Sequence, residues 1–181
     1  MSDNPSSAGN QQERLITIGW VLGFVDGEGC FSIGLVRQAG GGNRKCYRLG
    51  WQVVHRFAVV QGARSVEALE GLRDFFGVGR LYQNRRHDNH RENLYQFLVE
   101  RRDDLVEVVI PFFERFPLRT DKRHDFERFA HCVHMVNLGH HLHREGLVEI
   151  LTTMEGMNHR KSRAHLIRIL RDQTPNIPIA G

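Results

Sequence analysis

The sequence predicts an α+β fold with an antiparallel sheet, in the order α-β-β-α-β-β-α, followed by additional C-terminal helices. Three observations carry this prediction. Several segments place apolar residues at helical spacing, and two pairs of segments alternate apolar with smaller or polar residues as strands do. Loops rich in glycine or charge join the strands of each pair. With 181 residues, the chain is long enough to bury a core as one domain.

The first helix is predicted over residues 14–26. Residues 15–24 are almost all apolar and fit either a buried strand or a helix, but Gly19, Gly23 and Gly27 recur at every fourth position. This spacing places Gly19 and Gly23 on one helical face, where a second backbone can approach closely. In a strand, the same spacing would only weaken the segment. The glycines therefore favour the helix.

Two hairpins are predicted, with strands at residues 30–37 and 47–57, and at residues 79–86 and 94–100. In the first strand Phe31, Ile33 and Leu35 point to one side, so one face of the sheet is expected to be covered. Its partner strand would turn Leu49, Trp51 and Val53 to the same side and Arg48, Gly50, Gln52 and Val54 to the other.

Further helices are predicted at residues 63–76, 103–113, 119–138, 143–154 and 161–171, with Pro111 near a helix end or a kink. One face of the sheet must carry helices, which leaves the other face free. The expected organisation is a disordered arm at residues 1–12, a domain at 13–140, and a helical extension at 141–181 packed on that domain.

Composition sets loose bounds on function. The formal charge of +4 and the sequence pI of about 9.3 are a weak indication of a polyanionic partner. Cys30, Cys46 and Cys132 are widely spaced, which favours a reducing compartment over a disulfide framework. No apolar run is long enough for a membrane span. Arginine greatly outnumbers lysine, which favours a GC-rich bacterial genome and a cytoplasmic, nucleoid-associated protein, with an organelle-encoded protein as the alternative.

Two carboxylates, Asp26 and Glu28, stand at the C-terminal end of the first predicted helix. The helix dipole is negative there, so neither the dipole nor the neighbouring acid stabilises the other carboxylate. Both side chains could simply be solvated at a turn, since Asp-Gly is a common turn dipeptide. Alternatively, a hard divalent cation neutralises them through carboxylate and backbone oxygens, as Mg²⁺ prefers.

The segment from Trp20 to Ile33, WVLGFVDGEGCFSI, resembles the LAGLIDADG homing endonuclease motif in its form LAGFIDGEGCFSI. Residues 75–79, 110–113 and 117–126 resemble further segments of the same family in the same order. The resemblance covers about residues 15–150. It implies an enzyme that cuts both strands of double-stranded DNA at a specific site with Mg²⁺ or Mn²⁺. The chain shows one copy of the motif, so the resemblance implies a homodimer and a near-palindromic target.

The resemblance also assigns roles to residues. Glu28 matches the acid that binds the catalytic metal, and Gly27 matches a backbone carbonyl that contacts it. Asp26 matches the acid that braces the paired helices, and with Gly19 and Gly23 it is assigned to the dimer interface. One Glu28 from each subunit would then place metal ions that activate water and stabilise the leaving oxygen, each subunit cutting one strand.

Two further catalytic assignments are less specific. Lys122 lies where the family carries a basic residue near the scissile phosphate, but Asp121 departs from the family pattern and Arg119 is an alternative. Lys122 could equally be a surface lysine. His55 falls near a position where family members often carry a glutamine of the water network, so it could be a ligand, a proton shuttle or a bystander.

The free face of the sheet is the predicted DNA surface, because two-stranded ribbons fit the major groove. Residues of the strands and hairpin tips are candidate base or phosphate contacts, and for each one a solvated sheet edge is the alternative. The candidates are Ser32, Gln38, Arg44, Lys45, Arg48, Gln52, Arg80, Tyr82, Asn84, Arg86 and Gln96.

Two alternative functions use the same fold. An intron RNA-splicing maturase would keep the basic surface without needing Glu28, so host intron RNA is a possible partner. A non-cleaving DNA-binding regulator would usually have lost the acid. The histidines between His131 and His143 are expected to face solvent or phosphate rather than to bind zinc, because no cysteine or carboxylate partner has a suitable spacing.

Overall fold

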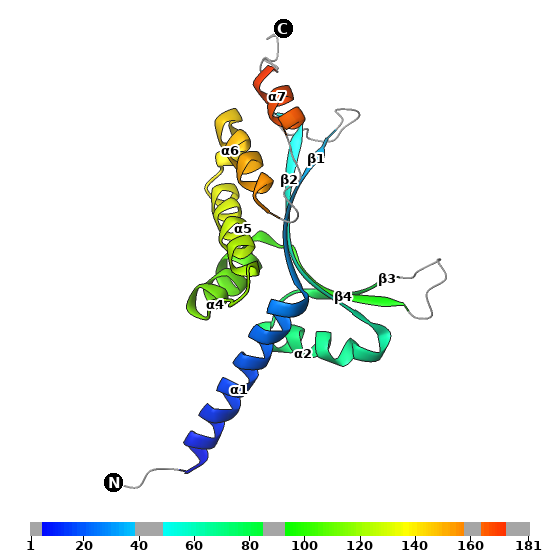
Figure 1. The fold of residues 1–181 in the computed structure, drawn as a ribbon, viewed down its shortest axis with the longest axis vertical. Helices are drawn as coiled ribbons and strands as arrows, with labels where there is room; N and C mark the ends of the chain where they lie inside the picture. The colour runs from blue at the N-terminus through cyan, green and yellow to red at the C-terminus, as the bar shows by residue number, and fades with distance from the viewer. Residues whose placement is uncertain (1–4, 39–48, 85–92, 158–163, 173–181) are drawn as a thin grey trace.

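The computed structural model describes residues 5–38, 49–84, 93–157 and 164–172, and it confirms the predicted α+β fold (Figure 1). Its elements are, in chain order, α1 (Pro5–Glu28), β1 (Gly29–Arg37), β2 (Trp51–Gly62), the 3₁₀ turn η1 (Ala63–Ser65), α2 (Val66–Phe76), β3 (Arg80–Asn84), β4 (Leu94–Val99), α3 (Arg102–Asp104), the π-helical turn η2 (Leu105–Val109), α4 (Ile110–Arg115), α5 (Lys122–Asn137), the 3₁₀ turn η3 (His140–Leu142), α6 (Arg144–Glu155) and α7 (Ala164–Asp172).

The four strands form one antiparallel sheet in the order β1-β2-β4-β3. The sheet bends strongly, so that β1 and β2 run upright in Figure 1 while β3 and β4 turn away from them. The helices α4, α5 and α6 lie on one side of the sheet, and the side opposite to them carries no helix among the described residues (Figure 1). The prediction of one covered and one free face is therefore confirmed.

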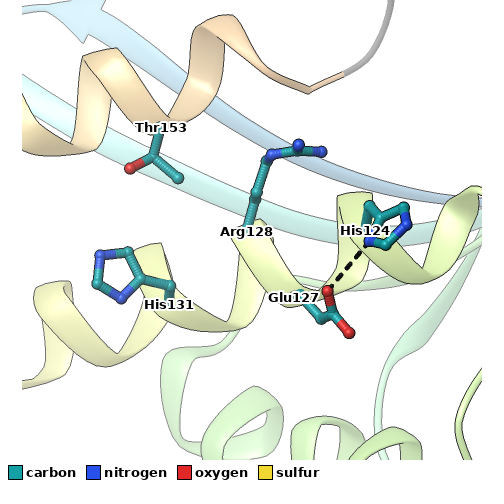
Figure 2. A pocket seen from close by; sticks show the side chains of 5 residues that line it. All are labelled: His124, Glu127, Arg128, His131 and Thr153. Carbon is teal, nitrogen blue, oxygen red and sulfur yellow. Dashed lines mark hydrogen bonds and ion pairs between the residues drawn. The ribbon is translucent and has the colours of Figure 1, made fainter.

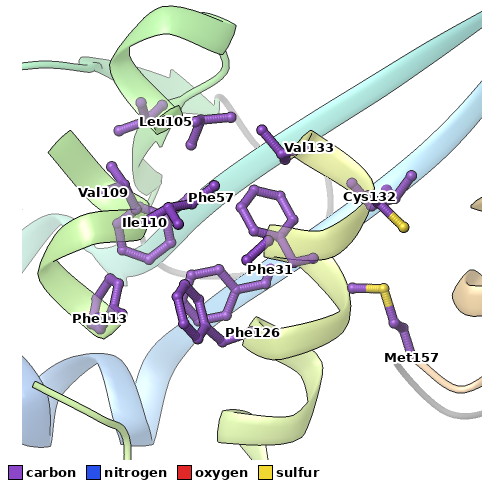
Figure 3. Packing of buried hydrophobic residues seen from close by; sticks show 14 of the residues in the cluster. Phe31, Phe57, Leu105, Val109, Ile110, Phe113, Phe126, Cys132, Val133 and Met157 are labelled. Carbon is purple, nitrogen blue, oxygen red and sulfur yellow. The ribbon is translucent and has the colours of Figure 1, made fainter. Parts of the chain in front are cut away.

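Phenylalanines of the strands and helices fill the space between the sheet and the helices (Figure 3). Phe31 of β1 stacks on its cross-strand partner Phe57 of β2, with ring centroids 5.0 Å apart. Phe113 of α4 meets both rings edge-on, at 5.5 and 5.6 Å, and Phe126 of α5 meets Phe31 at 5.3 Å. Such edge contacts add to the apolar burial that holds the helices on the sheet.

The C-terminal helices belong to the same core. Leu147, Ile150 and Leu151 of α6 are fully buried, and Leu170 of α7 is nearly so. These residues lie in one apolar cluster with the phenylalanines. No helix of the described residues is long and apolar enough to cross a membrane.

Several boundaries differ from the predictions, among them the ends of β2, which runs from Trp51 to Gly62 instead of from 47 to 57, whereas Pro111 lies near a helix end as predicted. The helix α1 begins at Pro5 instead of residue 14, so residues 5–12 of the expected disordered arm are helical. Residues 9–17 of this helix are exposed, so it extends beyond the body without packing of its own. Pro111 stands at the start of α4, where its missing N–H is least costly, directly after the π-helical turn. The helix α5 begins at Lys122 rather than at 119.

Candidate active site and nucleic-acid interface

The helix α1 runs directly into β1, with Glu28 as the last helical residue and Gly29 as the first residue of the strand. A Cβ atom at Gly29 would lie 2.6 Å from Val25 Cγ1 and 2.7 Å from the Val25 carbonyl oxygen. Only glycine fits this close approach. The junction fixes where Gly27 and Glu28 stand, at the edge of the sheet.

Asp26 binds a segment that is more than ninety residues away in the sequence. Its Oδ2 accepts the backbone N–H of Arg119 at 2.9 Å, and its Oδ1 accepts the Thr120 hydroxyl at 2.8 Å and the Thr120 N–H at 3.3 Å. Partial burial alone raises the pKa of Asp26, but these bonds and the charge of Lys122 together lower it below its ordinary value. Both oxygens of Asp26, which was assigned to the dimer interface, are thus engaged within its own chain.

Lys122 stands at the first residue of α5 and reaches back to the end of α1. Its Nζ donates to the carbonyl oxygens of Val25 at 3.0 Å and of Gly27 at 3.1 Å. A cation suits this position because the last carbonyls of a helix carry partial negative charge. Burial lowers the pKa of Lys122, and the charges of Asp26 and Glu28 act in the opposite direction. The structure therefore places Lys122 close to Gly27 and Glu28, which were assigned to the same site.

Glu28 and Gly27 are both exposed beside this contact. A carboxylate and a main-chain carbonyl are the oxygen ligands that Mg²⁺ prefers. Within the described residues, no group of three or more His, Cys, Asp or Glu side chains could hold a metal ion alone. Glu28 and the Gly27 carbonyl could together supply two oxygen ligands to a hard cation at the sheet edge.

His55, the third predicted catalytic residue, lies elsewhere. It pairs with Ile33 across β1 and β2, which places it on the helix-covered face of the sheet. Burial lowers its pKa, and the charges of Arg102 and His141 lower it further. Its Nδ1 atom is buried without a hydrogen-bond partner, as is the Nδ1 of His141. The structure does not bring His55 to Lys122 and Glu28, because strand alternation turns it to the side of the core.

The free face of the sheet carries the predicted DNA contacts that lie within the described residues. The register places Ser32 and Gln52 on this face of β1 and β2, and Gln38, the residue after β1, donates from its Nε2 to Gln52 Oε1 at 2.6 Å. On the other hairpin, Tyr82 pairs with Gln96, and the same alternation puts Arg80 and Asn84 beside them. Arg44, Lys45, Arg48 and Arg86 lie outside the described residues.

Arg56 also lies on the free face, and the sequence analysis did not select it. It pairs with Ser32 across the hairpin, and its Nε lies 3.9 Å from Glu100 Oε2, with about half of each side chain exposed. Gln52 was expected on this face, and every second residue of a strand points to the same side, so Arg56 could have been assigned to the free face as well. The neighbouring residues of this face are small or apolar, such as Gly34 and Val54.

A different exposed surface runs along α1. Ile16, Gly19, Trp20, Gly23 and Gly27 follow one another at helical spacing, and all five are exposed. Ile16 is 64% exposed and Trp20 42%, which is high for large apolar side chains in a folded domain. A Cβ added at Gly19 or Gly23 would meet no described atom within 4 Å. The face is therefore open to the close approach of another helix.

Two histidines of α5 lie near carboxylates, and Figure 2 shows one of these pairs, His124 with Glu127. His131 Nε2 lies 3.2 Å from Glu149 of α6, and His124 Nδ1 lies 3.2 Å from Glu127 on its own helix. A hollow between α5 and α6 is lined by His124, Glu127, Arg128, His131 and Thr153.

The fold and the motif residues define a family. A sequence profile of the LAGLIDADG endonucleases matches residues 21–133, and the chain belongs to this family. A protein from intron 1 of ND4 in Podospora anserina, named only as uncharacterized, is 30% identical over 68% of this chain and 25% of its own length. A probable intron-encoded endonuclease of Neurospora crassa is likewise matched over 25% of its own length, so this chain spans about a quarter of these two relatives.

Two solved structures share the fold. The homing endonuclease I-TnaI is 36% identical, superposes with a TM-score of 0.68, and is matched over 85% of this chain and 95% of its own. I-SmaMI, bound to its uncleaved DNA target in the presence of calcium ions, is 26% identical with a TM-score of 0.70. There the match covers 87% of this chain but only 49% of I-SmaMI.

Proposed function

We propose that this protein is a homodimeric, site-specific endonuclease that cuts double-stranded DNA at a near-palindromic site with a divalent cation. The observation that carries the proposal is the arrangement at the end of α1. Asp26 is engaged by Arg119 and Thr120, Lys122 lies on the helix carbonyls, and Glu28 remains exposed at the edge of the free sheet face. A single acid held beside a cation at a nucleic-acid surface is suited to phosphodiester hydrolysis.

Glu28 and the Gly27 carbonyl would hold Mg²⁺ or Mn²⁺, with the remaining ligands from a DNA phosphate, water and the second subunit. The ion would supply Lewis-acid stabilisation of the phosphate and an activated water. The Lys122 ammonium, 3.1 Å from the Gly27 carbonyl, is placed to stabilise negative charge that develops on the phosphate. The structural match to I-SmaMI, which was solved with DNA and calcium ions, supports the DNA partner and a divalent cation.

Two features support a homodimer. The chain matches about half of I-SmaMI but nearly all of I-TnaI, so one copy corresponds to half of the longer nuclease. The exposed face of α1 with Gly19 and Gly23 is the surface through which a second copy would pack. The two Glu28 carboxylates would then lie near each other across the twofold axis, each serving one DNA strand.

The intron in the name of the Podospora relative supports an intron-encoded origin for this chain as well. We propose an intron-borne gene, with an organelle as the better-supported compartment. The bacterial, nucleoid-associated location expected from the arginine content has no support among these relatives.

The proposal is tested with two differently tagged copies, wild type and Glu28→Gln, that are co-expressed and purified as homodimers and as the mixed dimer. Cleavage targets are selected from a randomised duplex library with Mg²⁺ and with EDTA. We expect double-strand breaks from wild type, no cleavage from Glu28→Gln, and nicks in one strand from the mixed dimer, because each Glu28 serves one strand.

Double-strand breaks from the mixed preparation, or activity in EDTA, would contradict the proposal. Binding of DNA without cleavage by any form would leave the non-cleaving regulator. Promotion of intron splicing by both homodimers, with no DNA cleavage, would leave the maturase.

A further inference from the structure

We propose that Thr120 is a positioning residue of the nuclease, acting through Lys122. This inference rests on the proposed function and names a side chain to which neither the motif nor the comparisons assign a role. Thr120 lies in the loop before α5 and is exposed, so burial does not explain its presence.

The Thr120 hydroxyl forms two hydrogen bonds with opposite roles. It donates to Asp26 Oδ1 at 2.8 Å, and it accepts the backbone N–H of Lys122 at 3.3 Å. Such a hydroxyl fixes a turn two residues ahead of itself. It therefore ties the carboxylate of the motif helix to the main chain from which the Lys122 side chain leaves.

The start of α5 depends on this hydroxyl. Asp121 stands at the N-cap position, but its side chain makes no capping hydrogen bond. Helix starts without a side-chain cap leave their first N–H groups unsatisfied. Thr120 satisfies one of these groups, that of Lys122, and the carbonyls of Thr120 and Asp121 bind the N–H groups of Arg123 and His124 at 3.0 Å.

The contacts close into a ring. Asp26 binds Thr120, Thr120 binds the backbone of Lys122, and the ammonium of Lys122 returns to the carbonyls of Val25 and Gly27 on either side of Asp26. Without the hydroxyl, the Arg119 N–H still binds Asp26, so the loop stays attached but the turn that aims Lys122 is lost. A displacement of about 1 Å at a catalytic group can lower a rate by roughly a hundredfold.

The test compares Thr120→Val, which removes the hydroxyl with little change of shape, with Thr120→Ser, which restores it. Thr152→Val is the matched control, since the Thr152 hydroxyl donates only within α6, to Val148 at 3.0 Å. On a target cut by wild type, we expect Thr120→Val to lower the single-turnover cleavage rate by roughly ten- to a hundredfold with unchanged DNA affinity. Thr120→Ser is expected to recover most of the rate.

A second readout does not depend on cleavage. The whole chain is used for hydrogen exchange of the Lys122 amide and for acylation of the Lys122 amine, and mass spectrometry follows both on the peptide that contains Lys122. Both reactions should speed up in Thr120→Val and remain at the wild-type rate in Thr152→Val. Unchanged exchange and acylation would overturn the proposal even if no DNA target were cut. Faster exchange with a wild-type cleavage rate would reduce Thr120 to a structural cap and also overturn it.

Discussion

The two faces of the central sheet differ in what their side chains touch. On the covered face, Phe31 and Phe57 stack on each other and contact five further phenylalanines of the sheet and helices. On the free face, the opposing pair Ser32 and Arg56 has only the half-exposed Glu100 as a described ionic neighbour. Along one strand, the odd residues therefore pack in the core, and the even residues lie on the face where we propose that DNA binds. Arg56 and Phe57 are adjacent in the chain, but Arg56 lies half-exposed on the free face and Phe57 is fully buried on the covered face.

The largest expected effect is on the covered face. Phe57→Ala removes a fully buried ring and leaves a cavity, which should lower the free energy of unfolding by about 3–5 kcal/mol. Denaturant unfolding of the purified protein measures this. The control is Val54→Ala, on the same strand and the opposite face, where we expect a far smaller loss. Equal losses at the two positions would contradict the division between the faces.

The second effect is on the free face. Arg56→Gln should weaken binding to a cognate target by about 1–3 kcal/mol and reduce its salt dependence, with little change in stability. Gly29 pairs with Val59, so Arg56 lies three residues along β2 from the end of α1, about 10 Å. That is about three base pairs measured along the DNA. Altered base preference should therefore appear about three base pairs outward from the cut in each half-site.

The control for this binding measurement is Arg73→Gln, an exposed change on α2 whose arginine pairs with Asp74. If Arg73→Gln weakens binding as much as Arg56→Gln, the effect is one of net charge, and the free face carries no particular contact at Arg56.

The smallest effect concerns His55, a polar residue on the covered face. Burial first, and then the positive charges of Arg102 and His141, hold its pKa below the ordinary value near 6.5, with Glu100 acting in the opposite direction. The unfolded chain therefore takes up a proton more readily, and stability is lost as pH falls below 6.5 through the lower pKa of the folded state. His55→Gln should flatten this loss by less than about 1 kcal/mol, after allowance for solvent screening.

Thermal unfolding between pH 7.5 and 5.5 measures the effect, with His165→Gln, an exposed change on α7, as control. An unchanged pH slope in His55→Gln would place the acid sensitivity elsewhere, with His141 as the next residue to test.

Local patterns predicted most of the fold. Helical spacing and strand alternation are properties of neighbouring residues, so the periodicity around Leu69 and Leu72, or Phe31 and Ile33, indicates the element directly. The ends of elements depended on more distant contacts. The loop directly before α5, for example, is held by bonds of Thr120 to Asp26, which is 94 residues away.

The candidate site divides in the same way. Glu28 and Gly27 lie close together in the motif and were assigned to the site from it, and Lys122 was assigned through the family resemblance of its segment. The ring through Asp26 and Thr120 had no local signal, because its bonds join residues far apart in the chain. The position of His55, in contrast, could have been predicted from a local pattern. Val53 was expected to face the core, and strand alternation turns His55 to the same side.

The direct passage from α1 into β1 has a mechanical consequence. With Gly29 packed against Val25 and no loop between Glu28 and Gly29, the helix and the strand form a stiff elbow. Inserting one residue there would rotate the helix by about 100° relative to the strand. In the proposed homodimer, this junction would fix the distance between the two DNA half-sites, so substitutions could change which bases are read more easily than how far apart the half-sites lie.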